Sequence, residues 1–418
     1  EQGKYHQVSQ DEATFLTLIL PPLAIMNTNR PEIAELAASA LEQARSINPD
    51  SIIPYLLLGL LAERSGRRED AFFLFDAAMK QAPSCYPARF GAARMHFALG
   101  RYSDASTALT FLKTSFPDNV ELLTLNTRVL FALDRLEDAQ AESQKAIILS
   151  GESGALYLLR AQILFAMVGR DSGARRMLNL ASAELENDSE YMRLDGALLV
   201  REERFDEAIA VYESAIVLYP EDEDFPVRLG KLLNDVGQSD AGTTVLKGAL
   251  SDGGDNIDVL KALLKSAVDR EEYAEAGEYI QLILDLDDSD ENLRQAVEIY
   301  LVLERYFIAA SFSAMLADSA DALPEDLITY GRILMSQEKA DQAKEAFLKA
   351  LDVAAVGDTR SIAHFELSKI AETPAERQQS LRLALGEDPQ NFDALVEYSL
   401  YFEELEDYRN ARQWLMQA

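Results

Sequence analysis

The feature of the sequence that most constrains its fold is a repeat with a period of 34 residues. Small residues recur at this stride through the chain, with one inserted residue before Ala174 and one deleted before Ala309. Ten of the twelve residues in the series are alanine. The series is Ala37, Ala71, Ala105, Ala139, Ala174, Ala208, Gly242, Ala276, Ala309, Ala343, Arg377 and Ala411. A period of this length predicts one small structural unit stacked many times, with a core that grows along one axis.

The residues that surround each alanine of the series predict an amphipathic helix. An aromatic residue or leucine follows four positions later, and a second alanine three positions after that, as in Ala71, Phe75 and Ala78. These offsets place the three side chains on one face of a helix. A small residue lets two helices pack at the short end of the usual spacing of about 8–10 Å. We therefore expect this face to be buried against a neighbouring antiparallel helix.

Turn and helix-start signals recur at the same stride. Acidic residues precede the alanine in segments such as 203–208 and 271–276, where they suit the positive end of the helix dipole. Prolines fall at the ends of units, where a residue without an amide hydrogen closes one helix before the next begins. These prolines are Pro49, Pro83, Pro117, Pro220 and Pro389. Each unit is therefore predicted to be a helical hairpin.

In these units the sequence resembles the tetratricopeptide-repeat family, which has small residues at the eighth, twentieth and twenty-seventh positions and proline at the thirty-second. These positions are Gly59, Ala71, Ala78 and Pro83 in the unit 52–85, and Gly196, Ala208, Ala215 and Pro220 in the unit 189–222. Gly242 and Arg377 depart from the pattern. The resemblance covers about twelve units and implies an all-α fold, a right-handed α-solenoid superhelix of helical hairpins.

The repeats also suggest how the chain is divided. We expect an N-terminal segment at 1–17, repeats one to seven at 18–256 and repeats eight to twelve at 257–418. Residues 251–256, which read Ser-Asp-Gly-Gly-Asp-Asn, form the most turn-like run in the chain. We interpret this run as a point of flexion, against the alternative of an ordinary loop between units.

Charge and composition exclude several classes of partner. The chain has 39 Lys plus Arg against 71 Asp plus Glu, a formal charge of −32. Nucleic-acid binding rests on basic side chains, so DNA and RNA are not expected partners. The sequence contains no unbroken run of about 18 apolar residues, the length that would predict a transmembrane span. The chain begins at Glu1 and has one cysteine, which we interpret as favouring a periplasmic or lipid-anchored envelope protein over a cytoplasmic one.

Residues that could carry chemistry are few. His6, His96 and His364 are far apart in the sequence, and none has a second ligand at metal-binding spacing. Cys85 has no cluster of positive charge to favour its thiolate. No phosphate-binding glycine loop, nucleophile elbow or zinc-protease motif occurs. We therefore expect no catalytic residues, no metal, no cofactor and no enzymatic activity.

The family resemblance implies that the first helix of each hairpin lines a concave groove. At the ninth position of these helices five of twelve residues are basic, and the fifth position adds three more. The basic residues are Arg94, Arg128, Lys231, Lys265 and Arg332, with Arg193, Lys261 and Arg294. Such a strip would attract an acidic segment of a partner. The alternative is that these side chains only neutralise neighbouring carboxylates such as Glu121, Glu190, Asp258 and Glu298.

Aromatic residues accompany the arginines in the N-terminal half. Phe90, Phe97 and Phe131 lie near Arg94 and Arg128 in the sequence, a mixture typical of interface anchors. We interpret these aromatic side chains as lining pockets for an extended or helical peptide. The alternative is that they pack in the core between successive helices.

These observations favour a non-catalytic scaffold that binds a protein or peptide partner in its concave groove. The alternative is a ligand-binding or transport accessory protein of the cell envelope. The last helix, with Trp414, Leu415 and Met416, either caps the array or joins two copies. We accordingly expect a monomer or a weakly associated homodimer. The identity and pathway of the partner are beyond what the sequence specifies.

Overall fold

The structure is a computed structural model, and it describes residues 10–25, 31–151, 153–250, 256–355 and 357–418. Within these ranges it contains 24 α-helices and no β-strand, which confirms the predicted all-α solenoid of helical hairpins. The helices are α1 (Gln10–Ile25), α2 (Pro31–Ile47), α3 (Ile52–Arg64), α4 (Arg68–Gln81), α5 (Tyr86–Ala98), α6 (Tyr102–Ser115), α7 (Val120–Ala132), α8 (Leu136–Ser150), α9 (Gly154–Ala166), α10 (Asp171–Leu185), α11 (Ser189–Arg201), α12 (Phe205–Leu218), α13 (Asp224–Asp235), α14 (Ser239–Ala249), α15 (Ile257–Asp269), α16 (Tyr273–Leu286), α17 (Asp290–Val302), α18 (Tyr306–Asp318), α19 (Pro324–Ser336), α20 (Ala340–Val353), α21 (Asp358–Lys369), α22 (Pro374–Glu387), α23 (Phe392–Glu404) and α24 (Tyr408–Leu415).

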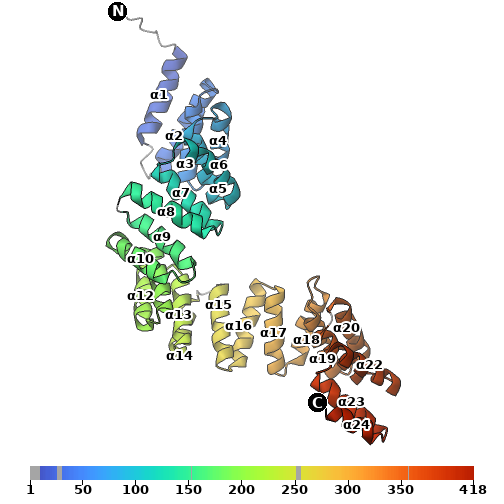
Figure 1. Cartoon of the computed structure of the whole chain (residues 1–418). Helices are drawn as coiled ribbons and strands as arrows, with labels where there is room; N and C mark the ends of the chain where they lie inside the picture. Colours follow the sequence, from blue (N-terminus) through green and yellow to red (C-terminus); the bar gives the residue numbers. More distant parts are fainter. Residues whose placement is uncertain (1–9, 26–30, 152, 251–255, 356) are drawn as a thin grey trace, which may run out of the picture. The chain divides into compact units, whose positions relative to one another are not determined.

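The chain forms two compact units, one ending at Leu218 and the other beginning at Tyr219. Unit 1 contains α1 to α12, and unit 2 contains α13 to α24. In each unit successive helices pair as antiparallel hairpins, and each hairpin packs on the next (Figure 1). The division of the sequence at 1–17, 18–256 and 257–418 stays a prediction. Of the expected flexion point, 251–255 lie outside the described residues, and Asn256 caps the N-terminus of α15.

The residues of the 34-residue series lie in the second helix of each hairpin and face the core. Ala71, Ala105 and Ala139, for example, have no exposed surface. At Gly242 a Cβ atom would lie 2.8 Å from the carbonyl oxygen of Gly230, so that even alanine would be crowded there. Arg377 is the exception, because it is partly exposed and donates to Glu397 and Glu404 of the following hairpin, at 2.5 and 2.7 Å.

Glycines in the first helices receive large side chains from the second. The ring of Tyr212 lies against Gly196, where a Cβ atom would be 2.3 Å from the ring. Phe347 occupies the equivalent place on Gly331, with the same distance of 2.3 Å. Phe347 has no exposed surface. The eighth position is therefore small because the backbone there forms the wall of a socket for the neighbouring side chain.

The turns inside ten of the hairpins, those from α3–α4 to α19–α20 and that of α23–α24, contain a residue in the left-handed region, again at about the stride of the repeat. Some of these residues are glycine, such as Gly66 and Gly100, with φ of 72° and 73°. Others are acidic, such as Asp134, Glu203 and Glu338, with φ of 57° to 58°. Left-handed backbone costs a non-glycine residue about 1–2 kcal/mol. The same turn is therefore kept in these ten hairpins even where its residue is unfavourable.

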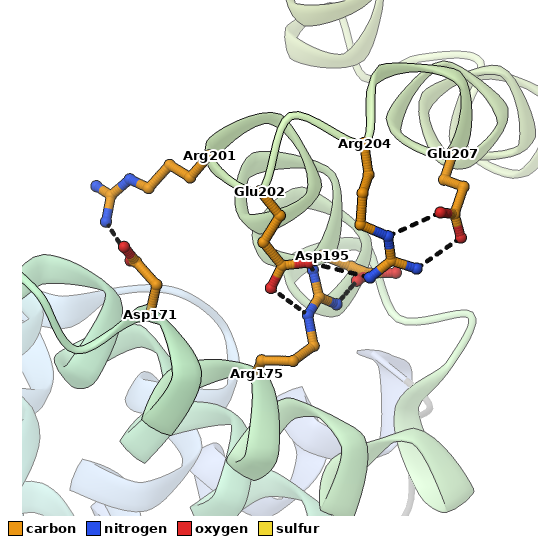
Figure 2. Close-up of polar contacts among 7 residues, drawn as sticks. All are labelled: Asp171, Arg175, Asp195, Arg201, Glu202, Arg204 and Glu207. Atoms are coloured by element: carbon orange, nitrogen blue, oxygen red, sulfur yellow. Dashed lines mark hydrogen bonds and ion pairs between the residues drawn. The ribbon is translucent and has the colours of Figure 1, made fainter.

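A network of ion pairs joins α10, α11 and α12 in unit 1 (Figure 2). Arg175 of α10 donates to Asp195 of α11 and, at 2.9 Å, to Glu202. Arg204 binds the same Glu202 at 3.0 Å and Glu207 at 2.7 Å. Although burial opposes it, hydrogen bonding from the two arginines lowers the pKa of Glu202. The network couples adjacent hairpins electrostatically in addition to their apolar packing.

The last hairpin covers its own core with an aromatic cluster. Trp414 of α24 lies 5.0 Å from Tyr398 of α23, measured between ring centroids. Leu415 and Met416 are exposed beside it. The two predicted roles of α24, capping the array or joining two copies, are distinguished by a measurement of oligomeric state.

Candidate functional site

Two adjoining pockets lie along α5, α7 and α9, which are the first helices of three consecutive hairpins in unit 1. The smaller pocket, of about 430 Å³, lies between Phe90, Leu125 and Leu156. The larger, of about 800 Å³, is lined by the same three helices and by the start of α11. Arg128 and Ala155 line both pockets. The two pockets are therefore parts of one surface, which we call the α5–α7–α9 groove.

Arg128 of α7 stands where the two pockets meet. Its neighbours Thr127 and Val129 are fully buried, whereas Arg128 itself is exposed. The guanidinium group forms no hydrogen bond or ion pair with any residue that the structure describes. All five of its N–H donors are therefore available to a binding partner.

Arg94 of α5 lies at one side of the groove and is already engaged. Its Nη2 atom is 2.6 Å from Oε2 of Glu63, and its guanidinium carbon lies 5.4 Å from the centre of the Phe90 ring. Burial raises the pKa of Glu63, and the opposing effect of Arg94 does not cancel this rise. The pair fixes Arg94 over the aromatic ring, so Arg94 shapes the groove more than it offers charge.

The three phenylalanines differ in exposure. Phe90 is only 7% exposed and stacks on Tyr86 at 5.5 Å between ring centroids. Phe97 and Phe131 are partly buried, and both line the larger pocket. Phe90 is therefore largely core, as the alternative interpretation held, whereas Phe97 and Phe131 present apolar surface to the groove.

Two family models match the chain. Both are described as tetratricopeptide repeat, one over residues 62–125 and the other over residues 327–356. The first runs from the end of α3 into α7 in unit 1, and the second covers most of α19 and α20 in unit 2. The matched segments show the socket glycines and buried alanines described above. The chain contains tetratricopeptide repeats.

Solved structures similar to these tetratricopeptide repeats come from several proteins. A thermophilic TPR protein of Thermus thermophilus is 27% identical, with 44% of this chain and 99% of that chain covered and a TM-score of 0.38. A tetratricopeptide repeat protein of Parabacteroides merdae is 19% identical, with coverage of 61% and 99% and a TM-score of 0.49. A chain of the APC/C hetero-tetramer Cut9–Hcn1 is 14% identical, with coverage of 99% and 87% and a TM-score of 0.44. No curated protein matches the chain.

Tetratricopeptide repeats are generally non-catalytic scaffolds for protein–protein interaction. Among the residues that the structure describes, no three His, Cys, Asp or Glu side chains are grouped so as to hold a metal ion. His6 lies outside those residues, and His96 and His364 lie in different units. No helix in the described ranges combines the length and apolar character that crossing a membrane requires.

The predicted basic positions are divided between the two units of repeats. Arg193 in unit 1 pairs with Glu190 at 2.5 Å, and Glu190 lines the larger pocket of the groove. The other five lie in unit 2 and line neither pocket of the groove; they are Lys231, Lys261, Lys265, Arg294 and Arg332. The structure therefore brings Phe90, Arg94, Phe97, Arg128 and Phe131 together at one surface of unit 1.

Three of the five predicted basic side chains in unit 2 have a carboxylate partner. Lys261 lies 3.9 Å from Asp287, and Arg294 donates to both oxygens of Asp326. Arg332 donates at 2.7 Å to Glu366, a buried carboxylate that also pairs with Lys369; these are contacts within the repeats. Lys231 and Lys265 are exposed and form no ion pair within the described residues.

Most of these partner carboxylates were not predicted from the sequence. Of the four acidic residues predicted as neighbours, only Glu190 forms a pair with one of the basic positions among the described residues. The partners observed for Arg94, Arg294 and Arg332 are separated from them by 31, 32 and 34 residues. Each separation lies within three residues of the 34-residue period, so each partner occupies a nearby position of the adjacent repeat.

Proposed function

We propose that this protein is a non-catalytic scaffold whose α5–α7–α9 groove binds a segment of a partner protein through Arg128. The observation that carries the proposal is the position of Arg128, a cation without an ion pair among the described residues, between two pockets with apolar walls. The segment it fits has apolar side chains on both sides of one acidic residue. No catalytic group takes part in such recognition.

The dimensions and lining of the groove support a peptide segment as occupant. Pockets of about 300–1,000 Å³ hold drug-sized molecules or the anchoring side chains of a peptide. Leu125 and Leu156 line one pocket, and Phe97 and Phe131 line the other. Aromatic and arginine side chains are the residues that contribute most binding energy at protein interfaces.

The charges around the groove limit what it accepts. Glu121 lines the smaller pocket, and Asp188 and Glu190 line the larger one. Arg128 is common to both. A partner with several acidic residues would meet these carboxylates, and like-charge contacts reduce affinity. We therefore infer that a single acidic residue, placed opposite Arg128, is preferred to a long acidic run.

For unit 2 we propose a different role for the paired basic residues. Arg294 and Arg332 each bind a buried carboxylate, which supports neutralisation as their role. Lys231 and Lys265 remain predicted contact residues, since both are exposed without an ion pair among the described residues.

A selection from a random peptide library tests the proposal with the full chain. We expect enriched peptides that carry one acidic residue between apolar residues. R128E should weaken their binding by about tenfold or more, because a buried charge-assisted contact is replaced by repulsion. The matched control is R305E, since Arg305 is also exposed and forms no ion pair among the described residues.

Two results would count against groove recognition. Peptides that bind wild type and R128E equally would place the contact elsewhere. The second result is that no peptide is enriched while an apolar fluorescent probe binds saturably in the groove. This result would favour the ligand-binding or transport alternative.

A further inference from the structure

A third pocket in unit 1 is lined by arginines and amides. It has a volume of about 340 Å³ and lies between α8, α9 and α10. Arg160, Arg170 and Arg176 line it together with the amides of Gln140 and Gln144, and no aspartate or glutamate is among its lining residues. In a chain with a formal charge of −32, three arginines around one cavity without a carboxylate are an exception.

Arg160 is held at this pocket by neutral groups only. Its Nη1 atom donates to the carbonyl oxygen of Gln140 at 2.9 Å and to Oγ of Ser143 at 3.1 Å. The other guanidinium nitrogens form no hydrogen bond with the described residues. Burial lowers the pKa of Arg160, and no neighbouring carboxylate opposes this effect. The pocket therefore contains a partly buried positive charge that no carboxylate among the described residues neutralises.

The other two arginines are exposed and equally unpaired. Arg170 directly precedes α10, and Arg176 lies inside it. Neither guanidinium group forms a hydrogen bond or ion pair within the described part of the chain. The adjacent Arg175 shows the contrast, because it is held by Asp195 and Glu202 (Figure 2). Of these three neighbouring arginines, only the two unpaired ones, Arg170 and Arg176, line the pocket.

We propose that this pocket binds a phosphate group carried on a small molecule. A planar guanidinium matches the oxygens of a phosphate with two parallel N–H donors. Three positive charges suit a dianion better than the single charge of a carboxylate. At about 30 Å³ per water molecule, a cavity of this size holds on the order of ten waters, which is room for a phosphate and a short attached group.

This site is separate from the α5–α7–α9 groove. Helix α9 contributes to both, but through different side chains: Leu158 and Gln162 line the groove, whereas Arg160 and Leu164 line the arginine pocket. The phosphate proposal therefore does not depend on the proposed function, and each can fail without the other.

Isothermal titration calorimetry of the full chain at constant ionic strength tests the site. The probes are inorganic phosphate, glycerol phosphate and acetate. We expect saturable binding of at least one phosphate compound and none of acetate. Preference for glycerol phosphate would identify a phosphomonoester as the source of the group, and equal binding would identify free phosphate.

The variant for this test is R170Q/R176Q, whose two arginines are exposed and leave the core unchanged. Loss of two charge-assisted contacts should weaken phosphate binding by about tenfold or more. The control R135Q removes an exposed arginine that precedes α8, lies outside the pocket and pairs with Asp138 at 2.5 Å; its affinity should equal that of wild type. No saturable phosphate binding by wild type, equal binding of acetate, or equal losses in the double variant and R135Q would each overturn the proposal.

Discussion

Arg294 of α17 binds both carboxylate oxygens of Asp326 in α19, one hairpin further along the chain. The distances from Nε are 2.9 and 3.1 Å, and Nη2 lies 2.9 Å from Oδ2. Asp326 is only 7% exposed, and its Oδ2 atom also accepts from the backbone N–H of Leu323 at 2.9 Å. One carboxylate therefore caps α19 and joins two hairpins of unit 2.

Removal of Arg294 should destabilise this junction. In R294A, Asp326 keeps its backbone contact but loses its charged partner while buried, at a cost of about 1–3 kcal/mol. Hydrogen exchange followed by mass spectrometry should show faster exchange in α17 to α20. R305A is the control, because Arg305 is exposed and unpaired among the described residues, and exchange there should stay within about 0.5 kcal/mol of wild type. Equal exchange in the two variants would show that the pair does not stabilise the junction.

At Gly331, replacement by alanine should destabilise the fold, although alanine normally stabilises a helix relative to glycine. A Cβ atom there would lie 2.3 Å from Cε1 of Phe347, whose side chain has no exposed surface. G331A should therefore destabilise α19 and α20 by about 1–3 kcal/mol through overpacking. Gly386 of α22 is the matched control, since an added Cβ meets nothing within 4 Å. G386A should stabilise the chain by up to about 1 kcal/mol, as alanine normally does in a helix. Urea unfolding followed by far-ultraviolet circular dichroism measures both, and stabilisation by G331A would refute the socket.

Acid sensitivity in unit 2 should depend on Glu275. Hydrogen bonds from Lys247 and Tyr279, both at 2.7 Å, lower the pKa of Glu275 from 4.5 to about 2. A group whose pKa is lower in the folded than in the unfolded state stabilises the fold above its unfolded pKa. Its contribution is therefore complete above pH 4.5 and is lost as the pH falls toward about 2.

Urea unfolding at a series of pH values checks this dependence. Between pH 4.5 and about 2, wild type should lose more stability than E275Q, which has no carboxylate to protonate. Above this range the difference between the two proteins should be constant. If wild type and E275Q lose equal stability as the pH falls through this range, Glu275 is not the cause of the acid sensitivity.

The periodicity of the sequence was sufficient to predict the helical hairpins. Ala71 and its counterparts are buried because each faces a neighbouring helix, a local requirement that recurs at every period. Glu298 was a reasonable predicted partner for the basic strip, yet Arg294 pairs with Asp326 across the next hairpin. Such partners depend on how each hairpin is rotated on its neighbour, and single-helix patterns do not contain this rotation.

The candidate sites, too, could be predicted from the sequence only in part. Arg128 was predicted from its position in the repeat, but that it is unpaired follows only from the positions of all carboxylates around it. Arg160, Arg170 and Arg176 lie outside the fifth and ninth positions of the first helices, so the groove pattern did not select them. Their common pocket arises where three helices meet.

A charge exchange between Arg128 and its bound peptide tests the central claim most directly. The peptide selected by wild type is compared with a version in which its acidic residue is lysine, and affinities for wild type, R128E and R305E are measured by fluorescence anisotropy. We predict that R128E loses the acidic peptide and gains the lysine peptide, while R305E behaves as wild type. Unchanged affinity of R128E for the acidic peptide would contradict recognition through the α5–α7–α9 groove.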